Sequence, residues 1–467
     1  MNFTISDILH TPHIRAMGFE SLTPQARVNN VSTDSRNIKR GDLFIALRGE
    51  KFDGHGFLDV AKKSGAVAAV VDNLWFTSNV RKAPKGLSLI VVKDTLHTYG
   101  DLANIYRNKF SIPILLVAGS NGKTTMKDVM SHVLGTSFNV LKTEANYNNH
   151  IGLPRMLFLL RPEHEIAIFE IGTNHPGEIE RLTEIAQPTH GIITNIGREH
   201  LEFFKNVMGV AKEELTLFHY LKDHEGFAFI NLDDKFSKLK AKSFGTNGIT
   251  FGTRKKASVY AVSKGLTTDG KQSIDLVINK KKINFKTAII ADYAPSLIAG
   301  VASVANHFGV RPTNIKQSFE SYIPHSKRME MVKFANGVLV INDAYNANPE
   351  SFAAAMQTLK QLPSKGKKYL VAGDMFELGT RSAEEHKALG KLMAKHKFDG
   401  YYFSGNAMKR AFAELLKATK TNATYADSKD DIARSLKEII RNGDVILIKG
   451  SRGMRMEEVL EKLRIEN

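Results

Sequence analysis

The chain has 467 residues, of which 42% are hydrophobic and 24% charged, so it is long enough for about three folded domains and is not of disordered composition. It contains no cysteine, which excludes disulfides, thiolate metal sites and cysteine nucleophiles. The net charge of +17 suits an anionic ligand, but the lysines stand in short, scattered groups such as 280–282 and 365–368. We therefore expect an anionic nucleotide substrate and no nucleic-acid partner.

Residues Met1–Phe19 lack the apolar segment and the small-residue cleavage site of a signal peptide. No apolar run approaches the roughly 18 residues that a transmembrane helix needs. Together with the absence of cysteine, these features predict a cytoplasmic protein without membrane insertion.

The first predicted domain, residues 1–94, is a small α/β unit. Short apolar runs bounded by turn residues predict strands at Leu43–Leu47, Val67–Val71 and Leu87–Val92, with a helix over Gly56–Ser64. A polar helix over Thr95–Lys109 follows, so we place the first domain boundary near residue 94.

The second predicted domain, residues 95–322, repeats strand and helix. Its buried parallel strands are expected at Ile114–Ala118, Ile166–Ile171, Gly191–Ile196 and Phe227–Asn231. Residues Gly248–Lys286 alternate in shorter strands, which predicts an antiparallel flank, and a helix over Pro295–Phe308 ends the domain.

The third predicted domain, residues 323–467, is Rossmann-like. Its strands are expected at Val338–Asn342, Tyr369–Ala372, Tyr401–Phe403 and Val445–Ile448. No G-x-G-x-x-G segment is present, so a dinucleotide cofactor is not supported. The fold class is therefore α/β in three domains, of which the central one is a parallel-sheet domain with an antiparallel flank.

The most informative segment follows the first strand of the central domain. It reads Gly119-Ser120-Asn121-Gly122-Lys123-Thr124-Thr125. Glycines let backbone N–H groups close around phosphate oxygens, and a lysine at the start of a helix adds positive charge there. A standard P-loop has a glycine five residues before the Gly-Lys pair, where this chain has Val117, so the turn is a compressed form that narrows the class of enzyme.

Three polar residues stand where strands of the central sheet should end: Glu170, Asn195 and His200. Ligands of open α/β sheets bind at the carboxyl ends of the strands. Glu170 is a candidate for holding Mg²⁺ on a nucleotide, and His200 is a candidate metal ligand. The alternatives are a solvated acid at a strand end and a structural histidine.

In combination these motifs resemble those of the Mur ligases, ATP-dependent amide-forming enzymes of peptidoglycan synthesis, along nearly the whole chain. In the first domain the similar segments are Ser32-Thr33-Asp34-Ser35-Arg36, residues 41–50 and Phe52-Asp53-Gly54-His55. In the second they are residues 146–154, 170–179 and 194–202. In the third, residues 342–349, 373–379 and 449–453 resemble the branch that adds D-alanyl-D-alanine. The Asp-Asn-Pro-Arg segment typical of siblings that add the third amino acid is absent.

The resemblance implies ATP and Mg²⁺ as cofactors and two small-molecule substrates, UDP-N-acetylmuramoyl-tripeptide and D-alanyl-D-alanine, bound by a monomer. The first domain would hold the UDP-sugar peptide. The expected substrate contacts are Ser35, Arg36, Arg48, Asp53, His55, Asn148, Asn149, Tyr345, Asn346 and Asn348. The third peptide residue, diaminopimelate or lysine, is left open.

The resemblance also implies a reaction in two steps. The peptide carboxylate attacks the γ-phosphate of ATP to give an acyl phosphate, and the amine of D-alanyl-D-alanine then displaces phosphate. Lys123 would neutralise the transferring phosphoryl group, Thr124 would ligate Mg²⁺, and Glu170 and His200 would ligate a further metal ion. Arg328 and Asp343 would reach the nucleotide from the third domain, although Arg328 could also be a simple linker cation.

Two departures from the family pattern stand out. Glu214 occupies the position at which these ligases carry a lysine modified to a carbamate, so we expect its carboxylate to supply the negative charge near the metal ions; in a different register Lys212 would be the modified residue. In the segment Tyr293–Leu297 the family usually has two asparagines, one of which contacts the nucleotide, whereas Ala294 and Leu297 of this chain cannot hydrogen-bond through their side chains. How adenine is held is therefore open.

Three alternatives remain beside this interpretation. The first is a sibling ligase with another amino-acid substrate. The second is a weakly active relative that serves as a nucleotide-gated scaffold, against which the presence of Lys123, Glu170 and His200 argues. A helicase or GTPase is disfavoured by the spacing of the turn.

Overall fold

The computed structural model describes residues 3–9, 14–17, 24–49 and 52–464; Glu50 and parts of the 1–19 segment lie outside them. The chain divides into two compact units. The first comprises Met1–Leu116, Phe138–Thr173 and Gly177–His190, and the second comprises Val117–Ser137, Asn174–Pro176 and Gly191–Asn467. The domain boundaries at residues 94 and 322 stay predictions.

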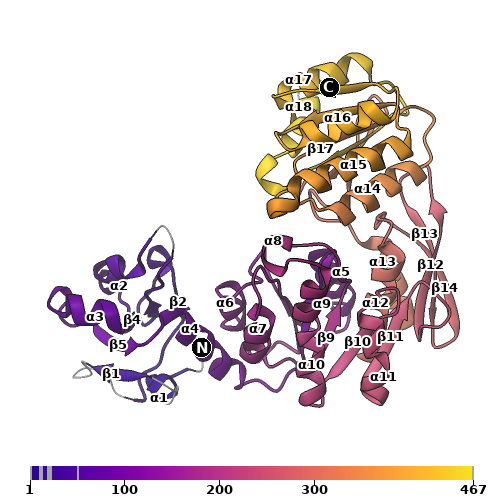
Figure 1. Cartoon of the computed structure of the whole chain (residues 1–467). Coiled ribbons are helices and arrows are strands. Elements are labelled where there is room, and N and C mark those ends of the chain that lie inside the picture. The colour runs from indigo at the N-terminus through magenta and orange to yellow at the C-terminus, as the bar shows by residue number, and fades with distance from the viewer. Residues whose placement is uncertain (1–2, 10–13, 18–23, 50–51, 465–467) are drawn as a thin grey trace. The chain divides into compact units, whose positions relative to one another are not determined.

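The N-terminal sheet has five strands in the order β1-β5-β4-β3-β2, with β1 antiparallel to β5 and the others parallel (Figure 1). The strands are β1 (Arg15–Met17), β2 (Val31–Ser32), β3 (Leu43–Ile45), β4 (Ala68–Asp72) and β5 (Ser88–Val92). Its helices include α1 (Ile5–Leu9), α2 (Leu58–Lys63) and α3 (Asn73–Asn79). Every residue of β3, β4 and β5 is buried, because helices and loops cover this sheet on both faces.

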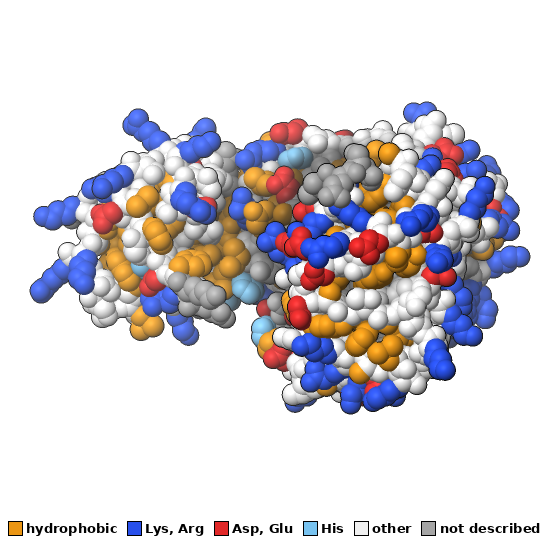
Figure 2. Space-filling view, turned by 90° about the horizontal axis from the view of Figure 1, so that it is seen from above, with side chains coloured by type: hydrophobic (Ala, Val, Ile, Leu, Met, Phe, Trp, Pro, Cys, Tyr) orange, Lys and Arg blue, Asp and Glu red, His pale blue; other side chains and the backbone are white. Residues whose placement is uncertain are grey.

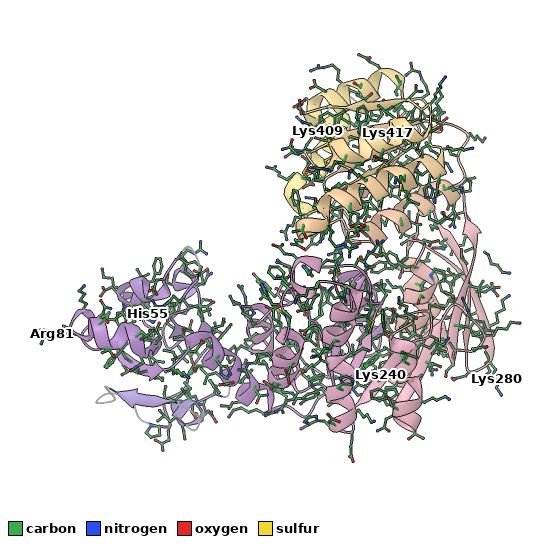
Figure 3. The ribbon with its side chains drawn as sticks, in the orientation of Figure 1. His55, Arg81, Lys240, Lys280, Lys409 and Lys417 are labelled. Carbon is green, nitrogen blue, oxygen red and sulfur yellow. The ribbon has the colours of Figure 1, made fainter. Side chains whose placement is uncertain are left out.

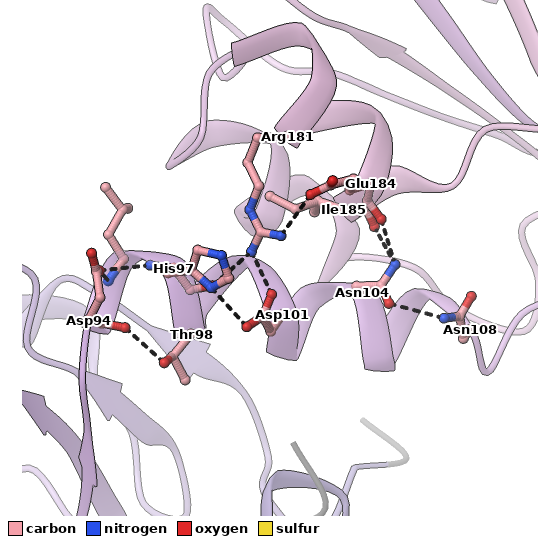
Figure 4. A network of polar contacts seen from close by, with 10 residues as sticks. Asp94, His97, Thr98, Asp101, Asn104, Asn108, Arg181, Glu184 and Ile185 are labelled. Carbon is pink, nitrogen blue, oxygen red and sulfur yellow. Dashed lines mark hydrogen bonds and ion pairs between the residues drawn. The ribbon is translucent and has the colours of Figure 1, made fainter. Parts of the chain in front are cut away.

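Helix α4 (Thr95–Arg107) begins at Asp94, whose carboxylate accepts hydrogen bonds from the backbone N–H groups of Leu96 and His97. The helix packs on α7 (Glu178–Ala186) through the polar contacts in Figure 4. Arg181 donates to Asp101 over 2.5 Å, and the amide of Asn104 donates to two carbonyls at the end of α7. These contacts fix α4 to the helices of its own unit.

The central sheet has nine strands in the order β14-β13-β12-β11-β10-β9-β6-β8-β7. The strands are β6 (Ile114–Ala118), β7 (Val140–Lys142), β8 (Ile166–Glu170), β9 (His190–Ile193), β10 (Phe227–Asn231), β11 (Gly248–Gly252), β12 (Val259–Leu266), β13 (Gln272–Ile278) and β14 (Lys281–Thr287). β12, β13 and β14 pair antiparallel, as predicted for the flank. The prediction is wrong for β11, the first strand of the predicted flank, which pairs parallel with both β10 and β12. The helices include α5 (Lys123–Leu134), α6 (Gly152–Leu157), α8 (Leu201–Phe204), α9 (Val207–Glu214), α12 (Ala294–His307) and α13 (Pro312–Ser321).

The C-terminal sheet has six strands in the order β15-β16-β20-β17-β18-β19. The strands are β15 (Glu330–Lys333), β16 (Leu339–Asp343), β17 (Lys368–Gly373), β18 (Gly400–Ser404), β19 (Ala423–Tyr425) and β20 (Val445–Lys449). Alternate side chains of β17 and β20 enter two different cores. One core is shared with α14 (Pro349–Gln361), α15 (Ser382–His396) and α16 (Met408–Ala418), and the other with α17 (Lys429–Ile439) and α18 (Glu457–Arg464). This part is a helix–sheet–helix sandwich, as predicted.

The α/β fold class is confirmed. The charged side chains are not gathered in one patch on the face that Figure 2 shows. Lysine and arginine side chains are spread over the face in Figure 2 with acidic side chains among them. The basic residues labelled in Figure 3 lie on different elements, for example Lys240 near α11 (Ala241–Phe244), Lys280 between β13 and β14, and Lys409 on α16. Among the described residues, no helix is both long and apolar enough to cross a membrane.

Candidate functional site: the turn after β6

The turn between β6 and α5 has the geometry of a phosphate-binding site. Gly119 and Gly122 have φ values of 113° and 79°, a region that favours glycine. A Cβ atom on Gly119 would lie 2.8 Å from the carbonyl oxygen of Asn195, so no larger residue fits there. The backbone N–H of Ser120 donates to that same carbonyl over 2.8 Å. The turn is therefore held tightly against the loop after β9, with the start of α5 open to an anion.

Lys123 is the first residue of α5 and folds back over the turn. Its Nζ donates to the carbonyl oxygen of Gly119 and lies 3.7 Å from Oε2 of Glu199. Both lysine and glutamate are largely buried, so the acid compensates the charge of the lysine in the ligand-free chain. A phosphate in the turn would offer Lys123 a stronger anionic partner.

Glu214 ends α9 and is fully buried behind the same turn. Its Oε2 accepts a hydrogen bond of 2.7 Å from the backbone N–H of Gly119. Burial, together with the negative charge of the neighbouring Glu199, raises the pKa of Glu214 to about 8. This shift favours the protonated form of Glu214, and a nearby cation would lower the pKa and favour the carboxylate. Lys212, the alternative residue, is exposed.

Two residues of the C-terminal part contact the turn directly. Nη2 of Arg328 donates to the hydroxyl of Thr124 over 3.0 Å, and its guanidinium carbon lies 3.8 Å from the ring centroid of Tyr345. Nδ2 of Asn348 donates to Oδ1 of Asn121 over 2.8 Å. The structure thus brings the predicted residues Arg328, Tyr345 and Asn348 to the phosphate-binding turn.

Asp343 lies at the end of β16 opposite Lys449 at the end of β20, because the two strands pair in parallel register. Nζ of Lys449 donates to Oδ2 of Asp343 over 2.5 Å and to the carbonyl oxygen of Asn346 over 3.0 Å. The other carboxylate oxygen of Asp343 accepts from the backbone N–H of Met329, next to Arg328. Lys449 is a buried cation for which no role was predicted, although it begins the motif at residues 449–453.

Glu170 ends β8 as predicted and is almost completely buried. Its Oε1 accepts from Nδ2 of Asn148 over 2.9 Å, while Oε2 has no hydrogen-bond partner among the described residues. Asn149 has a local role, since its side-chain oxygen accepts from the backbone N–H groups of Ile151 and Gly152. A buried carboxylate oxygen without a partner is the kind of ligand that Mg²⁺ takes.

His200 adopts a left-handed conformation with a φ of 45° immediately before α8. Such backbone is uncommon outside glycine and is concentrated at functional sites. Nδ1 of His200 lies 3.3 Å from Oε2 of Glu377. The described residues contain no group of three or more histidine, aspartate or glutamate side chains that could hold a metal, so Mg²⁺ here would need phosphate oxygens and water as further ligands.

The predicted substrate residues of the N-terminal domain come from two segments, one with Ser35 and Arg36 and the other with Arg48, Asp53 and His55. Arg36 is exposed and pairs with Asp34 over 2.8 Å, and Ser35 beside it is buried. Arg48 binds Asp72 over 2.7 Å and lies 3.6 Å from Asp53.

His55, labelled in Figure 3, is buried inside this domain and stacks on Trp75 with ring centroids 5.2 Å apart. Nε2 accepts from the backbone N–H of Asp72, so the proton is on Nδ1, which donates to Asp53 over 2.5 Å. Both ring nitrogens are occupied. In the structure the ring orients Asp53, and the predicted contact of His55 with substrate stays a prediction.

In the segment Tyr293–Leu297, neither Ala294 nor Leu297 presents a side chain that could bind the nucleotide. Ala294 and Leu297 are buried in the core of α12, while the ring of Tyr293 packs beside Gly122 of the turn. A small pocket nearby has a cavity volume of about 10 Å³, roughly the space of one water molecule. It is lined by Thr125, Ala288, Ile289, Ile290, Ala291, Tyr293, Tyr322, Pro324, Arg328 and Met329.

Replacing Glu214 by glutamine should flatten the pH dependence of stability of the ligand-free chain. Because the folded-state pKa is raised from 4.5 to about 8, the folded state binds the extra proton and loses stability as pH rises through that interval. The slope contributed by one such group is at most about 1.4 kcal/mol per pH unit. Denaturant unfolding between pH 5 and pH 8.5 measures it. A variant slope equal to that of the wild type would contradict the assignment.

Replacing Lys449 by methionine should destabilise the chain by about 3 kcal/mol, because the carboxylate of Asp343 would lose its buried counter-cation. Urea unfolding checks this value. The double variant with Asp343→Asn removes both charges and should recover part of the loss. A loss below about 1 kcal/mol in Lys449→Met would show that the pair is not a strong constraint.

Three protein-family profiles match the chain. The Mur ligase middle domain matches residues 117–301, and the profile described as Mur ligase, glutamate ligase domain matches residues 327–452. The profile described as Mur ligase family, catalytic domain matches residues 27–107. The segments predicted to carry the family motifs lie largely within these three matches.

Individual proteins match over nearly the full chain. The UDP-N-acetylmuramoyl-tripeptide--D-alanyl-D-alanine ligase of Bacillus subtilis (strain 168) is 35% identical over 445 residues, which are 94% of each chain. MurF from Acinetobacter baumannii has a TM-score of 0.86 at 26% identity, covering 99% of this chain and 98% of that one. MurF ligase from Thermotoga maritima in complex with ADP has a TM-score of 0.81 at 28% identity, covering 94% and 97%. The chain therefore belongs to the Mur ligase family, within its MurF branch.

Proposed function

We propose that this chain joins D-alanyl-D-alanine to UDP-N-acetylmuramoyl-tripeptide and converts ATP to ADP and phosphate, in the synthesis of peptidoglycan precursors in the cytoplasm. The observation that carries the proposal is the glycine turn after β6, closed on one side by Arg328 and Asn348 of the C-terminal part. The full-length similarity to ligases of this name, including one solved with ADP, supports the same reaction.

Both steps of the reaction develop negative charge that the site must stabilise. In the first step an oxygen of the peptide carboxylate attacks the γ-phosphorus, the bond to the β-phosphate oxygen breaks, and ADP leaves. In the second step the amine attacks the acyl carbon, phosphate leaves, and the amine loses a proton. Lys123 and Arg328 stand where they can stabilise the phosphoryl group, so catalysis rests mainly on positioning and electrostatics.

Thr124, Glu170 and His200 are the residues that we propose for Mg²⁺. The hydroxyl of Thr124 lies at the start of α5, and Glu170 offers a buried oxygen without a hydrogen-bond partner among the described residues. Bound Mg²⁺ would neutralise phosphate charge during transfer.

The N-terminal domain is our proposed site for the UDP-sugar peptide. The exposed cations Arg36 and Arg48 suit its diphosphate, and Asp53 is oriented between Arg48 and His55. The amine substrate is proposed to approach near Asn346 and Asn348, beside the phosphate-binding turn. A chain carrying every site residue needs no partner copy, so we propose a monomer.

A ligation assay tests the proposal. The chain is incubated with ATP, Mg²⁺, D-alanyl-D-alanine and the tripeptide substrate in its diaminopimelate and lysine forms, with product mass and phosphate release as readouts. Phosphate release should require both substrates, and Lys123→Ala should reduce it by at least about a hundredfold, since a phosphate-contacting cation is lost. Product formed with a single amino acid in place of the dipeptide would indicate a sibling ligase. Release without either substrate would reject the proposal.

The roles of Glu214 and Lys212 can be separated in the same assay. Glu214→Gln keeps the acceptor for Gly119 but cannot become negative, so activity should fall by about tenfold or more. Lys212→Ala, two residues away on the exposed side of α9, should retain activity within about twofold. Normal activity in Glu214→Gln, or activity of the wild type that depends on bicarbonate, would contradict a role for this carboxylate.

A further inference from the structure

The loop after β9 contacts the phosphate-binding turn through several hydrogen bonds. Nδ2 of Asn195 donates to the carbonyl oxygen of Asn121 over 3.0 Å. The backbone N–H of Gly197 donates to the hydroxyl of Ser120 over 2.9 Å. Any residue that anchors this loop therefore also acts on the turn.

Arg198 follows directly in this loop and binds two acids of the C-terminal part. Its Nε donates to Oε1 of Glu350 over 2.6 Å, and its Nη1 donates to Oε2 of Glu385 over 3.2 Å. Glu350 lies in the first turn of α14 and Glu385 in the first turn of α15. The side chain of Glu385 is only 3% exposed, so this ion pair is shielded from water on one side and is worth more than a surface pair.

The first turn of α14 also contacts the phosphate-binding turn itself. Asn348 caps α14, since its Oδ1 accepts from the backbone N–H of Ser351 over 2.8 Å. Its Nδ2 donates to Oδ1 of Asn121. Glu350, the partner of Arg198, stands two residues after this cap. The contacts therefore close a ring that runs from the turn to the loop after β9, through Arg198 to α14, and back to the turn.

We propose that Arg198 is a positioning residue for ATP: by binding Glu350 and Glu385 it holds Asn348 and Arg328 against the phosphate-binding turn. Among the described residues, the side chain of Arg198 donates to Glu350 and Glu385 and to neither Lys123 nor Thr124, so its effect on nucleotide passes through the C-terminal part. This inference rests on the proposed function, because it assigns ATP to the turn. It predicts an effect on nucleotide affinity with no effect on the UDP-substrate.

The test uses the full chain and four single variants, Arg198→Met, Arg198→Lys, Glu350→Gln and the control Glu384→Gln. Glu384 neighbours Glu385 on α15, is 73% exposed and pairs with Arg381. Its charge acts on Arg198 through space, but it takes part in neither ion pair of the ring. The control therefore removes the same charge without breaking the ring. ADP with Mg²⁺ is titrated by calorimetry. The KM values for ATP and UDP-tripeptide and the kcat are measured in the ligation assay.

Arg198→Met should weaken ADP binding and raise the KM for ATP about tenfold, as expected for losing a partly buried ion pair, while the KM for UDP-tripeptide stays within about twofold. Glu350→Gln should act in the same direction, because it removes one of the two acids that bind Arg198. Arg198→Lys should give intermediate values, since one ammonium replaces a two-sided guanidinium. Glu384→Gln should match the wild type.

Wild-type nucleotide affinity in both Arg198→Lys and Glu350→Gln would overturn the proposal, whether or not Arg198→Met folds. Tighter ADP binding in these variants would also overturn it, because the ion pair would then oppose nucleotide. An equal effect of Glu384→Gln would reduce the result to general charge. If the wild type binds ADP but forms no ligated product, the proposed function fails while the calorimetric test of Arg198 still decides this inference.

Discussion

The close approach of Gly119 to the loop after β9 is the constraint on which the site depends. A Cβ atom at Gly119 would come within 2.8 Å of the carbonyl oxygen of Asn195, so the turn can lie there only with a glycine in a left-handed conformation. On its other side the backbone N–H of Gly119 donates a hydrogen bond of 2.7 Å to Glu214. The same glycine therefore contacts both the loop after β9 and the buried acid of α9.

Three cations around this turn are paired with acidic side chains. Lys123 faces Glu199, Lys449 binds Asp343, and Arg198 binds Glu350 and Glu385. Arg328 differs, because it lies over the ring of Tyr345 and donates to a neutral hydroxyl. Arg328 can thus turn its charge toward an incoming phosphate without first breaking an ion pair in this set, whereas Lys123 must exchange one acid for another.

The sequence predicted the buried strands well and the exposed ones poorly. β6 and β10 begin and end at the predicted residues, because fully apolar runs mark both. β7, β15 and β19 were not predicted, and each of them is only partly buried, so no apolar run marks them. Local pattern detects burial on both faces of a strand, and a short strand at a sheet edge lacks it.

Contacts between segments that are far apart in the chain could not be predicted from local sequence pattern either. The pair of Asp343 and Lys449 depends on the parallel register of β16 and β20, which the chain order alone does not reveal. The environment of His55 depends on Asp72, the last residue of β4, and on Trp75 in α3. Both lie well after residues 52–55 in the chain. The turn itself was predictable because its seven residues are contiguous and their function is local.

Asn348 shows why one amide at such a site resists replacement. Its oxygen caps α14 and its nitrogen donates to Asn121, so the two ends of the side chain need opposite hydrogen-bonding character. An aspartate would keep the cap but place a second acceptor against Oδ1 of Asn121, and a serine would be too short to reach both. The amide therefore couples the start of α14 to the turn directly, and the ion pair of Arg198 with Glu350 constrains the same helix end from the other side. Two contacts of different chemistry on one helical turn leave little freedom for that helix end to rotate away from the phosphate-binding groups.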